Sequence, residues 1–217
     1  VDSNLRGFRA GLDAARIAPQ AASEPAKRWH TDATSLTALE QRIGQAPAAA
    51  QDIMREGVRR LTAYQDASYA KLYLDRLDAI RSADEIAHAD GRLLRETARH
   101  LAVRMSFEDV IRVAQAKIDP ARFSRIAAEL KLQPGEPYEL VEFLKPGIEE
   151  MCSVLPPGLA RRIIATSQRR GWLDRAHWGM ELKTTSISGY LRFWLLAKLR
   201  RWRPRSYRYG EEQAQIE

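Results

Sequence analysis

Cysteine is nearly absent from this chain of 217 residues, which limits the chemistry open to it. The single cysteine, Cys152, excludes an intrachain disulfide framework and a zinc or iron–sulfur site that needs several thiolates. No apolar run approaches the roughly 20 residues that span a bilayer. The first residues, Val1 to Asn4, have neither a basic leader nor an apolar stretch, so they resemble no signal peptide. We therefore expect a cytoplasmic protein and, because the chain starts with Val rather than Met, a fragment or a processed product.

The common catalytic and nucleotide-binding motifs are absent as well. The sequence contains no Gly-x-x-x-x-Gly-Lys, no Gly-x-Gly-x-x-Gly and no His-Glu-x-x-His. Cys152 could be a nucleophile if the fold brought a histidine near it, but we favour a small buried thiol. No two histidines lie four residues apart, and we expect surface or capping positions for all of them: His30, His88, His100 and His177.

Three pairs of adjacent acidic residues need no catalytic explanation. Neighbouring residues on a helix point about 100° apart, so such pairs make poor catalytic dyads. We expect them to stabilise helix starts through the helix dipole. They are Asp84/Glu85, Glu108/Asp109 and Glu149/Glu150. The sequence therefore predicts no catalytic, cofactor-binding or metal-binding residue in this chain.

The spacing of apolar residues fits a helical period through most of the sequence. We expect an all-α, bundle-like fold of seven to nine helices and at most one short strand, in residues 138–144. The expected helices include 4–17, a run over 48–80 with Gly57 as its weak point, 84–105 and 186–202. Gly171 is placed to end a basic helix, and residues 172–185 are predicted to be irregular. A stretch of small residues with two prolines, 18–25, has the composition of a linker.

The positive charge is concentrated in the C-terminal quarter. The net charge is +7, yet residues 161–209 alone carry 13 lysines and arginines against two acids. Such a segment favours an acidic partner. Its helix has apolar residues nearly all round, so we expect it to be buried on several sides. The predicted partner or anion contacts lie on it and just after it: Trp194, Arg200, Arg201, Trp202, Arg203, Arg205 and Arg208.

Four interpretations of this segment remain open. The favoured one is a docking helix whose basic end meets another subunit or an acidic face. The second is an anionic membrane surface, which suits a basic amphipathic helix with tryptophans. The third, least favoured as a partner, is nucleic acid, where arginines and aromatic rings meet phosphates and bases. The fourth is a core helix with a solvated basic end.

Several segments resemble the helical C-terminal half of the indolepyruvate oxidoreductase beta subunit family, which belongs to the 2-oxoacid:acceptor oxidoreductases. They form three regions. The first is GVRRLTAYQDASYAKLYLDRL (57–77), the second is MSFEDVIRVA (105–114) with Arg122-Phe123 downstream, and the third is KTTSISG (183–189) with RPRSYR (203–208) after the helix. Together they cover most of residues 50–210. The resemblance implies that residues 1–34 are the tail of an upstream α/β domain plus a linker, and that 35–217 form a helical accessory domain.

The resemblance also implies a reaction. Enzymes of this family oxidatively decarboxylate aryl 2-oxo acids such as indolepyruvate to acyl-coenzyme A thioesters. The thiamine diphosphate, its Mg²⁺ and the iron–sulfur clusters are expected in a large partner subunit, and the electrons pass to ferredoxin or a similar acceptor. No catalytic residue transfers to this chain. A weaker hypothesis has Arg201, Arg203, Arg205 and Arg208 contact coenzyme A phosphates or an acidic ferredoxin. The alternative from another class is an independent basic helical module that binds an anionic membrane or nucleic acid.

Overall fold

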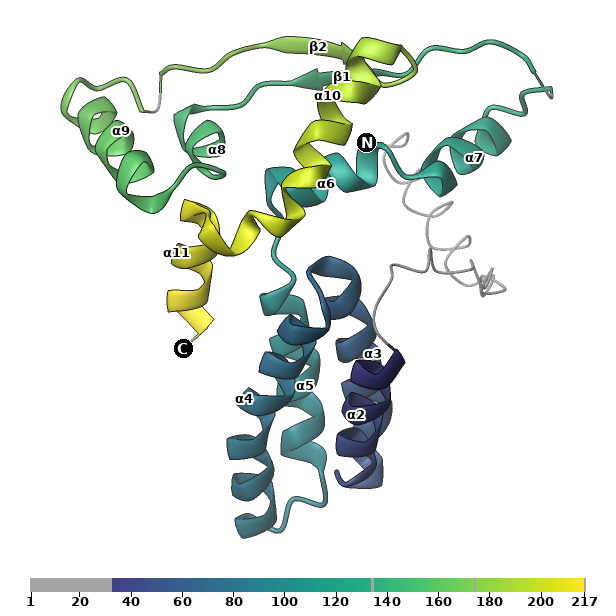
Figure 1. Ribbon diagram of the computed structural model, residues 1–217, viewed down its shortest axis with the longest axis vertical. Coiled ribbons are helices and arrows are strands. Elements are labelled where there is room, and N and C mark those ends of the chain that lie inside the picture. The colour runs from purple at the N-terminus through teal and green to yellow at the C-terminus, as the bar shows by residue number, and fades with distance from the viewer. Residues whose placement is uncertain (1–32, 134, 174, 217) are drawn as a thin grey trace, which may run out of the picture. The chain divides into compact units, whose positions relative to one another are not determined.

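The computed structural model describes residues 33–133, 135–173 and 175–216 (Figure 1). The chain divides into two units, Val1–Thr31 and Asp32–Glu217, and all described residues belong to the second. The predicted helix 4–17 and linker 18–25 lie outside the described residues. Ten α-helices are described: α2 Ala33–Gly44, α3 Ala48–Tyr64, α4 Ala67–Ile86, α5 Arg92–Met105, α6 Val110–Lys117, α7 Pro120–Glu129, α8 Ile148–Cys152, α9 Pro157–Arg169, α10 Ile187–Lys198 and α11 Tyr207–Ile216.

The all-α prediction is confirmed, with a small antiparallel sheet beside the helices. That sheet pairs β1, Val141–Leu144, with β2, Met180–Lys183. Two short 3-10 helices, η1 (Leu199–Arg201) and η2 (Arg203–Arg205), follow α10. The described residues thus contain ten α-helices and two strands, one of each more than the predicted maximum of nine helices and one strand. The extra strand, β2, lies in residues 172–185, which were expected to be irregular. Its four residues are a strand because they pair with β1.

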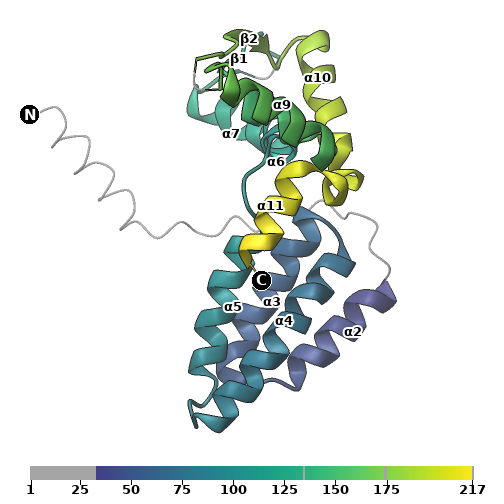
Figure 2. The same ribbon diagram turned by 90° about the vertical axis from the view of Figure 1, so that its left-hand side faces the viewer.

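Helices α3, α4 and α5 pack side by side and enclose the main core (Figure 2). Leu61, Tyr73 and Leu94 are fully buried there. Tyr73 donates a hydrogen bond from its hydroxyl to the carbonyl of Ala98 on α5, at 3.0 Å. A Cβ placed on Gly57 of α3 would lie 2.5 Å from that hydroxyl oxygen. Gly57 is therefore the point of close approach between α3 and α4.

Two helix boundaries predicted before residue 110 are wrong, and in both cases an aspartate explains the break. The run predicted over 48–80 is interrupted at Gln65, because the Asp66 carboxylate accepts from the Tyr69 amide at 2.9 Å and starts α4 anew. The helix predicted over 84–105 begins only at Arg92. Asp84 still belongs to α4, but its carboxylate accepts from the backbone amides of Gly91 and Leu94 and so caps α5 from outside.

The sheet rests on α6 and α10 through one of its faces. Leu182 of β2 packs with Ala114 of α6 and Phe193 of α10. Opposite Leu182, the buried carboxylate of Glu142 pairs with Lys117 and with Arg122. Burial alone would raise the pKa of Glu142, but the two cations outweigh it and the pKa is lowered. The two cations offset the cost of removing the Glu142 carboxylate from water.

Candidate docking surface

Helix α10 is fixed by its first turn and by one buried aromatic side chain. The Ser186 hydroxyl oxygen accepts from the Gly189 amide at 3.1 Å, which caps the helix. A Cβ on Gly189 would lie 2.0 Å from the carbonyl oxygen of Lys183, so glycine is needed for the turn out of β2. Phe193, one turn on, is buried against α6 and β2. One side of α10 is thus held against the rest of the domain.

The other side of α10 is an exposed apolar stripe. The prediction that this helix is buried on several sides is therefore wrong for the described residues. Ile187 is 89% exposed and Leu195 is 54% exposed, and the side chains between them on this face are also exposed. They follow Ile187 by three, four, seven and eight residues, which puts them on one face over successive turns. We call this set the α10 stripe: Ile187, Tyr190, Leu191, Trp194 and Leu195.

Positive charges border the α10 stripe. No acidic residue occurs between Lys183 and Gly210. The Lys198 ammonium lies 5.0 Å from the centre of the Trp194 ring. Exposed Arg192 and Arg201 have no ion-pair partner among the described residues. An apolar face with uncompensated cations at its edge is suited to a partner that has an apolar ridge bordered by carboxylates.

Arg203, predicted as a surface contact, is fully buried, and that prediction is corrected. Its side chain is 0% exposed. Nε and one terminal nitrogen contact the two carboxylate oxygens of Asp109 at 2.7 and 3.1 Å. The other terminal nitrogen donates to the Tyr64 carbonyl at 2.6 Å and to Gln65 Oε1 at 3.0 Å. Its guanidinium carbon also lies 4.1 Å from the centre of the Tyr64 ring. Arg203 is satisfied inside the domain and is not available to a partner.

Two further predicted contacts are half-buried and hold the chain after α10 in place. Arg200 donates to the Thr62 carbonyl at 2.8 Å, and burial, with the nearby Arg203, lowers its pKa. Trp202 donates from its indole nitrogen to the Val154 carbonyl at 2.9 Å. The helix predicted over 186–202 accordingly ends at Lys198 and continues as 3-10 turns.

The remaining predicted contacts are exposed. Arg208 pairs with Glu212 on the same helix at 2.5 Å. Arg205 lies 5.9 Å from the Trp202 ring centre and, like Arg201, has no acidic partner in the described ranges. Of the seven predicted residues, Trp194, Arg201 and Arg205 are thus exposed without an acidic partner there. The rest of the α10 stripe was seen in the sequence as part of an apolar helix, but nothing local showed which side stays uncovered.

The other candidates for chemistry take the structural roles expected of them. Cys152 is buried, and burial together with Glu149 raises the pKa of its thiol. His88, His100 and His177 are exposed, while His30 lies outside the described residues. Glu150 accepts from the Gly147 amide at 2.9 Å at the start of α8.

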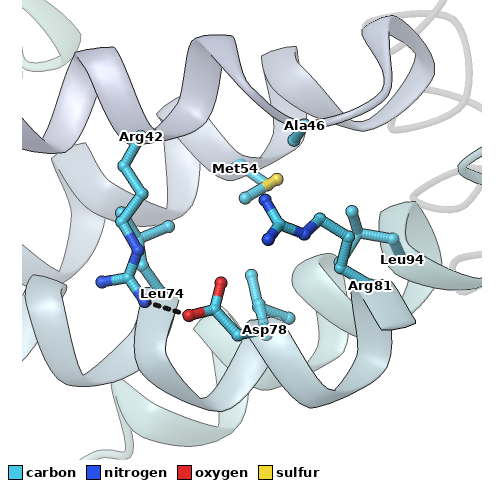
Figure 3. Close-up of a pocket in the computed structure, with 8 residues that line it drawn as sticks. Arg42, Ala46, Met54, Leu74, Asp78, Arg81 and Leu94 are labelled. Carbon is cyan, nitrogen blue, oxygen red and sulfur yellow. Dashed lines mark hydrogen bonds and ion pairs between the residues drawn. The ribbon is translucent and has the colours of Figure 1, made fainter. Parts of the chain in front are cut away.

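The cavity among α2–α5 is too small for a ligand. Its volume is about 10 Å³, room for about one water molecule. Figure 3 shows it between α2 and α4, with Arg42 bound to Asp78 at its edge. In the described part of the chain, no group of three or more His, Cys, Asp or Glu side chains could hold a metal ion. No helix there is both long and apolar enough to cross a membrane.

Fold and surface together define a mostly helical domain with a two-stranded sheet and one uncovered apolar helix face. The chain belongs to DUF6537, a family of unknown function whose model matches residues 50–217. Comparison with curated proteins gave no match. Comparison with solved structures gave none either.

Proposed function

We propose that this chain is the helical C-terminal part of the beta subunit of a cytoplasmic indolepyruvate oxidoreductase, and that the α10 stripe binds its large partner subunit. The three regions that resemble that family support the first part. Tyr64 and Gln65 come from the first region, Asp109 from the second and Arg203 from the third. These residues meet in one buried cluster, although Asp109 and Arg203 are 94 positions apart. The resemblance therefore falls on residues that depend on one another.

The observation that carries the docking role is the α10 stripe itself. Large apolar side chains exposed next to one another on one helix face mark an interaction surface more often than scattered ones do. In the proposed complex, the partner subunit carries thiamine diphosphate, Mg²⁺ and the iron–sulfur clusters and decarboxylates the aryl 2-oxo acid. The role of this chain is to assemble with that subunit into the complex. Arg201 and Arg205 are the cations placed to meet carboxylates of that subunit or of an acidic electron acceptor such as ferredoxin.

Co-expression with the large thiamine-binding subunit tests the proposal. The variant Leu191→Glu/Leu195→Glu puts two charges into the α10 stripe without touching the buried Phe193. We expect the subunits to separate on size-exclusion chromatography and indolepyruvate-dependent reduction of the acceptor to fall. The control Val103→Glu changes an exposed apolar residue on α5. Unchanged complex formation and turnover in the double variant would rule out docking through this face.

A second candidate function is binding to an anionic membrane surface through the same face. It is favoured by one observation, the tryptophan and cations that share the end of α10. The stripe is short, however: the eight steps from Ile187 to Leu195 rise about 12 Å. Sedimentation with vesicles of anionic and of neutral lipid separates the candidates. Binding to anionic vesicles that Leu191→Glu/Leu195→Glu abolishes, without any complex with the large subunit, would favour the membrane.

A further inference from the structure

A shallow hollow lies on α9, in a part of the domain that the docking proposal does not use. About 340 Å³ of space lies over it, most of it open to solvent. The hollow is lined by Arg162, Ile163, Thr166, Ser167 and Trp172. Ile163 also packs against the small core beneath α9, so the floor is apolar. A half-exposed indole, an arginine and two hydroxyl groups complete the lining.

The position of Trp172 is determined by the way α9 ends. Gly171 has a φ of +65°, which lets the chain turn back over the helix. The Gly171 amide donates to the Gln168 carbonyl at 3.0 Å, and the Trp172 amide donates to the Ser167 carbonyl at 2.9 Å. This pair of bonds is the Schellman motif. The backbone of Trp172 is therefore fixed beside the hollow, and 51% of the residue's surface is exposed.

The charges around the hollow are positive. Arg162 has no ion-pair partner among the described residues, whereas its neighbour Arg161 reaches Glu211 at 3.3 Å. The guanidinium of Arg170 lies 4.9 Å from the centre of the Trp172 ring. A second cation thus stands at the indole without an acidic partner in the described ranges. The hollow thus combines an aromatic surface with the guanidinium of Arg162, and a second guanidinium, that of Arg170, lies at the same indole.

We propose that this hollow binds a nucleotide, with its base against Trp172 and its phosphate at Arg162. The exposed indole of Trp172 offers a stacking surface to any base. A guanidinium matches phosphate oxygens with two parallel hydrogen bonds. The Ser167 hydroxyl and the Thr166 hydroxyl, which donates to the Arg162 carbonyl at 2.7 Å, add polar groups to the lining for a ribose or a base edge. An isolated inorganic anion would use the arginine and leave the aromatic wall unused.

Calorimetric titration of the full chain with ATP and AMP tests this, with adenosine and tripolyphosphate as partial ligands. Trp172→Leu should weaken ATP binding by about fivefold or more, the loss of one stacked base. Arg162→Gln should weaken ATP binding but leave the much weaker adenosine binding unchanged. The matched control is Trp178→Leu, since Trp178 is exposed to a similar degree and does not line the hollow.

A short 5′-phosphorylated single-stranded RNA separates a free nucleotide from the end of a strand. If only the RNA binds, and Trp172→Leu weakens it, the nucleotide that the hollow takes is part of a strand. If ATP, AMP and the RNA all fail to bind, the proposal is overturned. So would binding that Trp172→Leu leaves unchanged, or tripolyphosphate binding as tight as that of ATP.

Discussion

Arg203 should contribute more to stability than any other residue of the basic segment. Replacing it with Met keeps much of the apolar stem and removes every bond of the guanidinium. Asp109 would then remain buried with the Arg112 amide at 2.6 Å and a long contact to the Tyr64 hydroxyl at 3.5 Å. Breaking a buried ion pair by removing one partner destabilises proteins by about 3–5 kcal/mol. Because Asp109 keeps one strong hydrogen bond, we expect the free energy of unfolding to fall by about 3 kcal/mol.

Urea unfolding followed by circular dichroism measures this loss. The control is Arg205→Met, two residues along, which changes an exposed side chain and should stay within about 0.5 kcal/mol of the parent. A double-mutant cycle with Asp109→Asn adds a second criterion. Since both groups belong to one cluster, the double variant should lose clearly less than the sum of the two single variants.

Two results would refute this reasoning. The first is an Arg203→Met variant as stable as the Arg205→Met control, which would mean that the buried pair adds nothing over an apolar side chain. The second is strict additivity in the cycle, which would mean that Arg203 and Asp109 do not act on each other. Either would also weaken the argument that the regions resembling the oxidoreductase family depend on one another.

Two further changes test the packing of the domain. Gly57→Ala should lower the melting temperature by an amount equivalent to about 1–3 kcal/mol, because the new methyl group would collide with the buried Tyr73; a rise in melting temperature would show that α3 and α4 separate freely. Lys117 and Arg122 lower the pKa of Glu142, so its contribution is fully present above the ordinary carboxyl pKa of 4.5 and is lost as the pH falls through the lowered value. Urea midpoints between pH 7 and 3 should therefore fall less steeply for Glu142→Gln than for the parent, and parallel curves would count against this.

The helical fold could be predicted because its signals are local. Periodic apolar residues, the aspartates at 109 and 119 before α6 and α7, and Gly171 after α9 all act within one or two turns. The pairing of β1 with β2 gave no such signal, since its partners lie about 40 residues apart in the chain and MELK shows no strand pattern. The break between α3 and α4 depends on Asp66, whose capping role is equally plain locally but was masked by the continuous apolar period around it.

Gly57 shows how the same residue changes meaning once the packing is known. By helix propensity alone, glycine within a helix costs about 1 kcal/mol relative to alanine, so Ala at this position should stabilise the chain. The structure reverses that expectation, because the missing side chain is what lets Tyr73 approach and bond Ala98. Propensity describes a helix in isolation, and α3 does not stand alone.

The C-terminal segment could not be divided correctly from its sequence, for a physical reason. A run of arginines predicts a solvated surface, and an apolar helix predicts a buried position. Both predictions rest on burial averaged over many proteins. In this chain one arginine is buried and part of the apolar helix is exposed. Arg203 is covered because a carboxylate 94 residues away offsets its charge, whereas Ile187 and Leu195 stay uncovered because nothing in the described domain reaches them. Burial in both cases is decided by what lies opposite, and for the α10 stripe we expect that surface to belong to another chain.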